Sequence, residues 1–428
     1  MGSAHVLARR WIVCVGVLLV TIGGLAMAVA ASVEITHFTY SGHGREWLEY
    51  LETMAPRFEA ETGVKVSFLV TGSNAEWKPK LTSMLAGGVA PDVTDGHPAI
   101  AGPFASQGVF VDLRPYIERD NIPVNQMPPA AVEGVKAPNG MMWGFPISIY
   151  PMVTFFNADM FSQMGLLTPS QLGEKWDWDA FSRSAKRLTT DTNGDGVTDI
   201  YGTYRQNWRW EMHVHQAGGK IWDRLVFPTK SFFNTPEVLK AMTWLHDLMA
   251  VNKVDSLGGS YTVWNEKAAM TLAYGPGVIN TYLRNVSFNW DIASQPKGEA
   301  SRAARVNPDG FQVLASSKHR EAAWGWVKFI AGNVNSQLEF TKVTGRMPSL
   351  RQAMLQYPKV MDLLPENWMA FVDTGFDPAS YAPYVYQDAR LESLVSSVTG
   401  QVWKGQLSPE AAVQRIHEQA QALLAEGV

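Results

Sequence analysis

The sequence predicts an α/β protein with two lobes around a cleft, and three observations support this prediction. The chain has 428 residues, more than one hydrophobic core usually organises. Strand-like and helix-like patterns alternate after residue 33, as in parallel sheets with crossover helices. The apolar stretch 143–157 contains Pro146 and Pro151, and proline fixes φ and removes a backbone donor. We therefore expect extended chain on each side of a kink, which we interpret as a crossing between the lobes.

The first lobe is predicted from alternating strands and helices. This order implies a parallel sheet, and ligands on such sheets bind at the loops after the strand ends. Those loops are 40–44 and 95–98. The predicted strands are 33–40, 64–70 and one that begins at Pro91; the predicted helices are one through Trp47 and Phe58 that ends at Gly63, one at about 74–85 and one at 99–107.

The second lobe is predicted to begin near Tyr150. Asp177 is placed to cap a helix at 178–188. Thr235 precedes Pro236 and is placed to cap another helix. Ser408, Pro409 and Glu410 open the last helix of the chain in the same way.

The composition is that of a soluble globular protein. Hydrophobic residues make up 46% of the chain and charged residues 18%. The net charge of −4 gives no electrostatic reason to expect nucleic-acid binding. The chain has 16 tryptophans, whose flat apolar faces and single donors suit both sugar rings and protein cores.

The N-terminus has the pattern of an export signal. Arg9 and Arg10 precede an apolar run from Trp11 to about Val29, and Ala28 and Ala30 fit the small-residue cleavage pattern. Cleavage would place the protein in the periplasm or outside the cell. The alternative is a retained N-terminal anchor, since the run is about long enough to span a bilayer. Removal of residues 1–30 also removes the only cysteine, so neither disulfides nor a thiol nucleophile are expected.

A series of segments in fixed order extends over the rest of the chain. The first are FTYSGHG, FEAETGVKVSF, WKPKLTSMLAGGVAPDV and GVFVDLRPYI. The next are WGFPISIYPMVTFFNADMF, WDWDAFSRSAKRLT and DTNGDGVTDIYGT, followed by AGGKIW, KAAMTLAYGPG, SSKHREAAWGWVKFI and TGRMPSL. In this order the chain resembles the extracellular solute-binding proteins of ABC importers, the large family that includes maltose-binding protein. The resemblance implies a periplasmic-binding-protein-like fold, with two α/β lobes joined by a multi-crossing hinge around a cleft.

The resemblance also implies how the chain is divided. The signal peptide, 1–30, is followed by the first lobe at 31–147 and the second lobe at 148–296. The chain then returns to the first lobe at 297–345, and 346–428 completes the second lobe with its C-terminal helices. The segment 344–348 is expected to be the late crossing.

The two strand-end loops of the first lobe match positions that line the cleft in relatives. Tyr40, Ser41 and His43 lie in the first loop, and Asp95 and His97 lie in the other. A carboxylate suits a sugar because its two oxygens accept hydrogen bonds from two hydroxyls. Ordinary loop solvation is the alternative for each residue. Arg346, at the late crossing, is a further ligand candidate, with a surface ion pair as its alternative.

Two tryptophans precede a glycine pair in the second lobe. Counting back from Gly218 and Gly219, Trp208 falls where sugar-binding relatives present a stacking aromatic ring. If the segment is extended, Trp210 points to the same side. Trp222, just past the glycine pair, is a third candidate. The alternative for all three is burial in the core.

The loop after Tyr274 departs from the family pattern. Many sugar-binding relatives carry Gly-x-Trp or Gly-x-Tyr here, whereas this chain has Gly277 at the aromatic position. Tyr274 is the candidate to supply the ring instead, and a wider site is the alternative.

One loop has the ligand pattern of a structural calcium site. Oxygen donors alternate as they do in the first nine positions of a calcium-binding loop, but the twelfth position, which should be Glu, is Gly202. A remote carboxylate would have to replace it, and the alternative is an Asx-rich turn. No other cofactor is expected. The candidate ligands are Asp191, Asn193, Asp195, Val197 and Asp199.

Taken together, these patterns predict a monomeric binding protein that captures a carbohydrate and delivers it to a membrane permease, without catalysis. An exported glycoside hydrolase would also carry tryptophans and carboxylates in a cleft, but it needs two carboxyl groups at a defined separation. The same fold could instead bind a polyamine, which needs several carboxylates, or a glycerophosphate, which needs arginine or a helix N-terminus.

Overall fold

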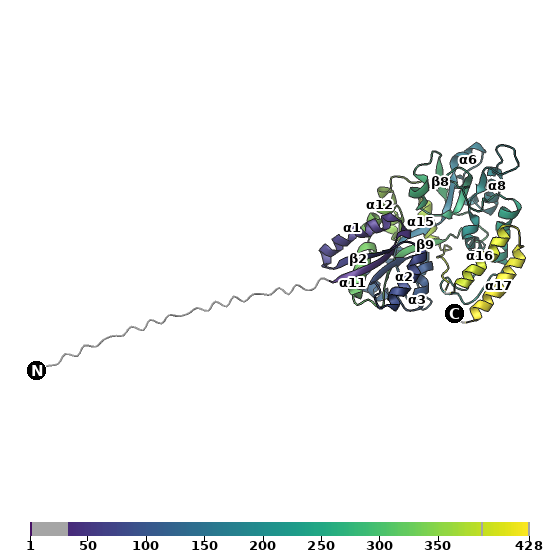
Figure 1. Cartoon of the computed structure of the whole chain (residues 1–428). Helices are drawn as coiled ribbons and strands as arrows, with labels where there is room; N and C mark the ends of the chain where they lie inside the picture. The colour runs from purple at the N-terminus through teal and green to yellow at the C-terminus, as the bar shows by residue number, and fades with distance from the viewer. Residues whose placement is uncertain (2–32, 387, 427–428) are drawn as a thin grey trace. The chain divides into compact units, whose positions relative to one another are not determined.

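Two separate β-sheets organise the chain (Figure 1). The structure is a computed structural model and describes Met1, residues 33–386 and residues 388–426. The predicted signal peptide and the alternative N-terminal anchor lie outside these residues. Within the described ranges, no helix has both the length and the apolar character needed to cross a bilayer.

The larger sheet has six strands in the order β10-β4-β9-β3-β1-β2 and forms the first lobe. Strands β1, β2 and β3 pair in parallel, as predicted. Strands β4 and β10 join them through β9 in antiparallel fashion. The strands are β1 (Glu34–Tyr40), β2 (Lys65–Thr71), β3 (Val93–Gly96), β4 (Phe145–Pro151), β9 (Val306–Val313) and β10 (Met347–Pro348).

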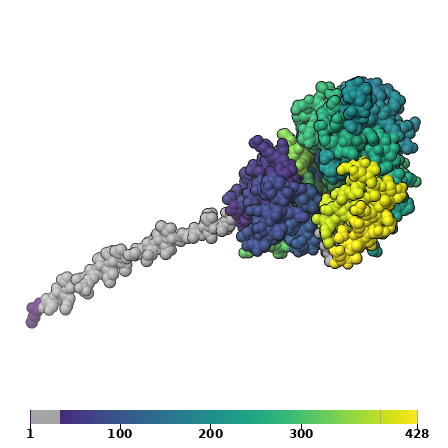
Figure 2. Space-filling model, turned by 45° about the vertical axis from the view of Figure 1, so that its right-hand side comes forward, coloured from purple at the N-terminus to yellow at the C-terminus, as the bar shows by residue number. Residues whose placement is uncertain are grey.

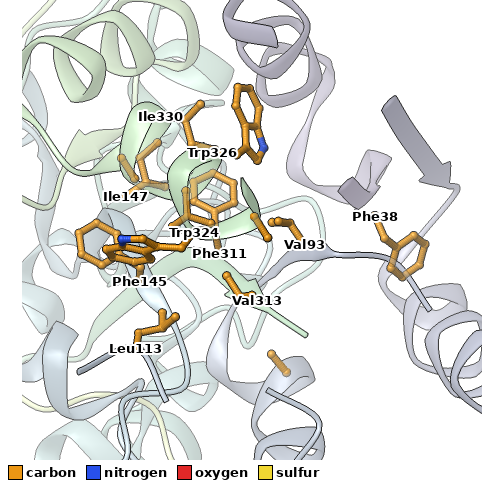
Figure 3. Close-up of a cluster of buried hydrophobic side chains, with 14 of the residues drawn as sticks. Phe38, Val93, Leu113, Phe145, Ile147, Phe311, Val313, Trp324, Trp326 and Ile330 are labelled. Carbon is orange, nitrogen blue, oxygen red and sulfur yellow. The ribbon is translucent and has the colours of Figure 1, made fainter. Parts of the chain in front are cut away.

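Helices cover this sheet and enclose the core of the first lobe (Figure 3). Trp324 and Trp326 of α11 are buried in that core, and the indole of Trp326 donates to Nδ1 of His37 at 3.0 Å. The helices are α1 (Arg45–Thr62), α2 (Asn74–Ala86), α3 (Pro98–Ser106), α4 (Arg114–Arg119), α5 (Pro129–Glu133), α11 (Arg320–Ala331), α12 (Val334–Thr344), α13 (Arg351–Met354) and α14 (Tyr357–Val360).

The smaller sheet has four strands in the order β6-β7-β5-β8 and forms the second lobe. One buried cluster of this lobe is its own and includes residues of α8, α10, α16 and α17. A second cluster is shared with the first lobe, since it contains Phe155 of the smaller sheet and Ile149 of the larger one. The strands are β5 (Val153–Asn157), β6 (Tyr201–Thr203), β7 (Ala268–Tyr274) and β8 (Trp290–Ala293). The helices are α6 (Ala158–Gln163), α7 (Pro169–Leu172), α8 (Trp178–Leu188), α9 (Glu211–Gln216), α10 (Pro236–His246), α16 (Ala389–Trp403) and α17 (Pro409–Ala425).

Two of the three predicted N-caps form. Asp177 accepts a hydrogen bond from the backbone N–H of Ala180 at 2.7 Å, and Ser408 accepts one from Ala411 at 3.3 Å. The prediction for Thr235 was wrong in one respect: it holds the N-cap position of α10, but its buried hydroxyl has no hydrogen-bond partner in the described part of the chain.

The two sheets are joined where the sequence predicted a crossing. Strand β4 belongs to the first sheet and β5 to the second, and only Met152 separates them. The backbone N–H of Met152 donates to the carbonyl of Arg305 at 3.0 Å, and that of Val306 donates to Tyr381 at 2.8 Å. Three crossings of the chain therefore lie side by side, near residues 152, 305 and 381, and form the hinge.

The late part of the chain divides differently from the prediction. Met347 and Pro348 do not cross between the lobes but pair with Ile149 and Ser148 at the edge of the first sheet. The short helices α13 and α14 then pack against α12, which keeps this segment in the first lobe. The chain reaches the second lobe only after α15 (Met369–Phe376).

Candidate functional site

A cavity of about 480 Å³ lies between the two lobes. On the first lobe, Lys78 of α2 and Ala99 and Pro103 of α3 line it. Figure 2 shows the blue surface of this part of the first lobe beside the yellow C-terminal helices. On the second lobe the lining residues are Asn207, Trp208, Arg209, Trp210, Glu211, Ile221, Tyr384, Tyr386 and several residues of α16, and Arg305 lines it from the hinge.

Residues 207–211, which we call the second-lobe wall, are helical rather than extended. Gln206–Arg209 form a 3₁₀ helix, and α9 begins at Glu211. Arg205 precedes this helix in the left-handed region, at φ 60°, and turns the chain into it. The condition on which Trp210 would point to the same side as Trp208, extended chain, is therefore not met, yet both tryptophans of this wall line the cavity. Trp208 is 40% exposed, whereas Trp210 is 6% exposed because it packs on Phe233 and Trp403.

Two guanidinium groups lie over the ring of Trp208. The Cζ atom of Arg205 is 4.5 Å from the ring centroid, and that of Arg209 is 4.1 Å from it. Tyr274 is nearly buried beside the same indole, with its ring centroid 5.4 Å away. Its hydroxyl accepts a hydrogen bond from Arg205 Nη1 at 3.1 Å. Trp208, Tyr274 and the two arginines thus form one cation–aromatic cluster at the cavity.

Arg305 and Glu211 form an ion pair at the base of this wall. Arg305 Nη1 lies 2.9 Å from Glu211 Oε1, and Arg305 Nε donates to Asn307 Oδ1 at 2.8 Å. Burial and the nearby charge of Arg305 lower the pKa of Arg209 to about 10, although Glu211 acts in the opposite direction. The cavity is therefore lined here by two guanidinium groups, of Arg209 in the wall and Arg305 in the hinge, and by one carboxylate, of Glu211.

The predicted residues of the two strand-end loops form a packed cluster in the first lobe. His43 lies between the rings of Tyr40 and Trp47, with centroid distances of 4.2 Å and 4.0 Å. Asp95 is fully buried; it accepts from the indole of Trp47 at 2.8 Å, and its Oδ1 lies 3.2 Å from His43 Nε2. Burial alone would raise the pKa of Asp95, but the charge of His43 and hydrogen bonds from His37 and His43 hold it below its usual range. These groups hold the loop in place, and Asp95 has no surface open to a solute in this structure.

The other two residues of these loops are more accessible. Ser41 is exposed and donates to the carbonyl of Gly72. His97 is half-buried and lies 3.5 Å from the side-chain nitrogen of Asn74. Burial lowers the pKa of His97 to about 4, and the charges of Arg305 and Arg209 contribute to that shift. With that pKa, the ring of His97 is uncharged near pH 7.

Arg346 lies at the edge of the same cluster. Its Nη1 donates to Asp309 at 2.6 Å and its Nη2 to the carbonyl of His43 at 2.7 Å. Its guanidinium lies over Trp47, 5.2 Å from the ring centroid. The ion pair is half-buried rather than at the surface, and Arg346 holds the strand-end loop in place through its bond to the carbonyl of His43.

Trp222 lies in the core of the second lobe. It is 0% exposed, and its indole donates to the hydroxyl of Tyr386 at 3.1 Å. Tyr386 lines the cavity, so Trp222 supports the cavity from behind and offers no ring face to a solute.

The space beside Gly277 is filled by a residue that the sequence did not single out. A Cβ atom built on Gly277 would lie 2.9 Å from Cε2 of Tyr150, and one on Gly275 would lie 2.6 Å from Cδ1 of the same ring. Tyr150 is the penultimate residue of β4, beside the hinge, and burial raises the pKa of its hydroxyl to about 12. The ring at this position therefore comes from the hinge as well as from Tyr274.

The candidate calcium loop is closed by its own hydrogen bonds. The carboxylate of Asp191 accepts from the backbone of Asn193, Gly194 and Gly196. Asn193 and Asp195 accept from the N–H groups two residues on, and Asp199 accepts from Thr192. Val197 is exposed. Within the described ranges, no three His, Cys, Asp or Glu side chains come together to hold a metal ion. Calcium binding by this loop stays a prediction.

Comparison with known proteins places the chain in a family. The model of the bacterial extracellular solute-binding proteins matches residues 42–336, more than half of the sequence. The protein belongs to this family.

Solved structures support the fold of this solute-binding protein. An ABC substrate-binding protein from Listeria monocytogenes, in complex with cycloalternan, is 23% identical, with 92% of this chain and 99% of that chain covered and a TM-score of 0.75. The cyclic α-maltosyl-1,6-maltose-binding protein of Arthrobacter globiformis is 18% identical over 92% and 100%, with a TM-score of 0.77. The sugar-binding protein MalE of Xanthomonas citri is 19% identical over 92% and 98%, with a TM-score of 0.76. The predicted periplasmic-binding-protein-like fold, with two α/β lobes and a hinge of several crossings, is confirmed.

Several residues of the solute-binding protein's cavity were missed by the sequence analysis. Tyr384, Tyr386 and Trp403 reach it from the last segment of the chain, and Arg305 reaches it from the hinge. The aromatic run 381–386 was a usable signal, because three tyrosines in six residues suit a binding surface as well as a core. Arg305 had no comparable local signal.

Proposed function

We propose that this protein captures a carbohydrate in the cavity between its lobes and delivers it to the permease of an ABC importer. The observation that supports this most is the second-lobe wall. There the 40% exposed indole of Trp208 stands beside hydrogen-bonding groups of Asn207, Arg209 and Glu211. An apolar ring face packs on the C–H face of a pyranose, while polar groups around it bond the hydroxyls. The relatives that bind cycloalternan and a cyclic maltosyl-maltose agree with this ligand class.

Capture requires no chemical step. The lobes close about the three hinge crossings, and only the closed form contacts the ligand from both sides, so the ligand shifts an existing equilibrium toward closure. The permease then recognises the closed form. We propose that the protein acts as an exported monomer and not as an enzyme.

The charge on the wall disfavours one alternative ligand. A polyamine needs several carboxylates around the aromatic rings, but two guanidinium groups, from Arg205 and Arg209, lie over Trp208.

The hydrolase alternative is tested directly, since an enzyme would release shorter sugars during incubation.

The test is a thermal-shift and calorimetric screen of the mature protein against mono- and oligosaccharides. We expect at least one sugar to raise the unfolding temperature and to be recovered unchanged. Trp208→Ala should weaken its binding by about tenfold, because one stacked ring contributes about 1.4 kcal/mol. Tyr282→Ala is the matched control, since it removes a 48% exposed ring that does not line the cavity. Failure of every sugar to bind would refute the proposal, and cleavage products would favour the hydrolase.

A further inference from the structure

One arginine of the cavity, Arg209, has no partner in the described part of the chain. Arg209 lines the cavity, but within the described ranges no carboxylate lies within ion-pair distance of it. Its Nε is buried without a hydrogen-bond partner in the same part of the chain. Arg305 differs, because Glu211 and Asn307 both accept from it. The single carboxylate of the wall is thus used by the neighbouring arginine.

An unpaired cation in this position is unfavourable for the unliganded protein. A charge removed from water is stable only when a partner of opposite charge or a hydrogen bond compensates it. Arg209 is half-buried and lines the same cavity as Arg305, so two like charges face one space. Charged groups that lack a compensating partner are concentrated at functional sites, where a bound ligand supplies the opposite charge.

Stacking on Trp208 holds Arg209 without using its donors, which have no acceptor among the residues that the structure describes. Its Cζ atom lies 4.1 Å from the centroid of the Trp208 ring, so the flat face of the guanidinium is fixed by the indole. The N–H groups of a guanidinium lie in its plane, and stacking does not use them. A guanidinium positioned by stacking can therefore present two parallel N–H groups to a planar or tetrahedral oxyanion.

The neighbouring side chain of Asn207 is suited to accept a hydrogen bond from a ligand hydroxyl. The side-chain oxygen of Asn207 lines the same wall, is buried, and has no donor in the described part of the chain. A carbonyl oxygen accepts hydrogen bonds, so its complement on the ligand is an O–H or N–H group. The cations that line the cavity, Lys78, Arg209 and Arg305, exceed its carboxylates, Glu211 and Glu392, by one charge (3 − 2 = +1).

We propose that the ligand is an acidic sugar, and that Arg209 binds its oxyanion, a carboxylate or a phosphate, while Asn207 accepts from a hydroxyl. The inference rests on the proposed function and narrows its ligand class. It explains why the cation is retained without a protein partner: the ligand supplies the negative charge when the lobes close.

Matched sugars test the proposal on the mature protein. Glucose, glucuronate and glucose 6-phosphate, together with a neutral and an acidic disaccharide, are titrated by calorimetry at low and at high salt. We expect the acidic member of a pair to bind at least about tenfold more tightly, the usual effect of a charge-assisted hydrogen bond, and the preference to shrink at high salt. Comparison of glucuronate with glucose 6-phosphate identifies whether the site binds a carboxylate or a phosphate.

Variants of Arg209 separate a ligand role from a structural one. Arg209→Gln should remove the preference for the acidic sugar and leave the neutral one within about threefold, with no decrease in the unfolding temperature of the free protein. Arg209→Lys should keep part of the preference, because it retains the charge but loses the paired donors. Arg187→Gln, an exposed arginine of α8 in the same lobe, is the matched control and should bind as the parent does.

Three results would overturn the proposal. Equal affinity for neutral and acidic sugars, or a preference for neutral ones, would refute it while leaving carbohydrate binding intact. An Arg209→Gln variant that weakens both ligands equally and lowers the unfolding temperature would make Arg209 a structural residue. Binding of no sugar of either kind would remove the proposed function itself, and this inference with it.

Discussion

Arg305 Nη1 lies 2.9 Å from Glu211 Oε1, and this ion pair joins a hinge crossing to the second-lobe wall. The two side chains are 13% and 12% exposed. Arg305 also receives the backbone hydrogen bond of Met152, which belongs to the neighbouring crossing. The pair therefore fixes the wall of the cavity to the part of the molecule about which the lobes move.

Removal of Glu211 should destabilise the protein strongly. Glu211→Gln leaves Arg305 without its carboxylate beside the unpaired Arg209, and loss of one member of a mostly buried pair costs about 3–5 kcal/mol. The measurement is the free energy of unfolding in urea. The control is Glu133→Gln, whose partner Lys136 lies 2.7 Å away at an exposed position, where about 0–1 kcal/mol is expected. Similar losses in the two variants would show that the Glu211 pair is no more than a surface contact.

The stability of the protein should fall between pH 6.5 and pH 4, partly because of His213. The side chain is fully buried against Trp244, and its Nδ1 donates to Gln216 Oε1 at 3.0 Å. Burial lowers its pKa from 6.5 to about 4. Between these values the unfolded chain binds a proton that the folded protein does not, so stability is lost as the pH falls.

Replacement of His213 should make the free energy of unfolding depend less steeply on pH. His213→Phe keeps a ring in the core but cannot titrate, so the slope of the unfolding free energy in this window should decrease by at most about 1.4 kcal/mol per pH unit. Part of the slope should remain, because burial also lowers the pKa of His97 and His215 to about 4. An unchanged slope in denaturant titrations at several pH values would contradict the assignment to His213.

Local signals predicted the elements of the fold better than they predicted its crossings. The cap at Asp177 and the ends of α8 depend on residues a few positions apart, so the sequence pattern contains all that determines them. The late crossing was misplaced because β10 is only two residues long and exists through pairing with β4, some 200 residues earlier. No periodicity reveals a pairing of that kind.

Prediction of the candidate site from the sequence was limited in the same way, because its geometry depends on contacts between distant residues. Trp208 was found from its spacing to a glycine pair, but the left-handed Arg205 that turns the chain into a helix there gave no sequence signal. Trp222 follows the same glycine pair, yet its indole bonds Tyr386 in the core. The unpaired state of Arg209 depends on which arginine takes Glu211, and only the three-dimensional arrangement decides that.

The loop at 191–199 should bind calcium weakly, if the alternating oxygens reach one ion. The carboxylate of Asp191 already accepts from three backbone N–H groups, and the twelfth loop position is Gly202 rather than Glu. We expect millimolar calcium to raise the unfolding temperature above its value with a chelator, and Asp195→Asn to reduce that difference. Asp223→Asn, in another loop of the second lobe, is the control. Identical unfolding with calcium and with chelator would leave the loop an Asx-rich turn.

Glycine at position 277 is required by the ring of Tyr150. Gly277→Ala would place a methyl group 2.9 Å from Cε2 of that ring, and Gly275→Ala would place one 2.8 Å from the carbonyl of Pro151 as well. Overpacking of this kind costs about 1–3 kcal/mol, and the Gly275 variant should lose more because a backbone oxygen cannot move aside as a ring can. Gly325→Ala is the matched control: the nearest atom to its added methyl group, Cζ of Phe58, is 3.6 Å away, an ordinary van der Waals distance. Inside α11, and away from the cavity, that change should stabilise the protein by about 0.5–1 kcal/mol. Because Tyr150 lies in β4 beside the hinge, a displaced ring should also weaken sugar binding by Gly277→Ala. Unfolding and binding both at parental levels in that variant would show that Tyr150 has room to move and that the glycine is not needed.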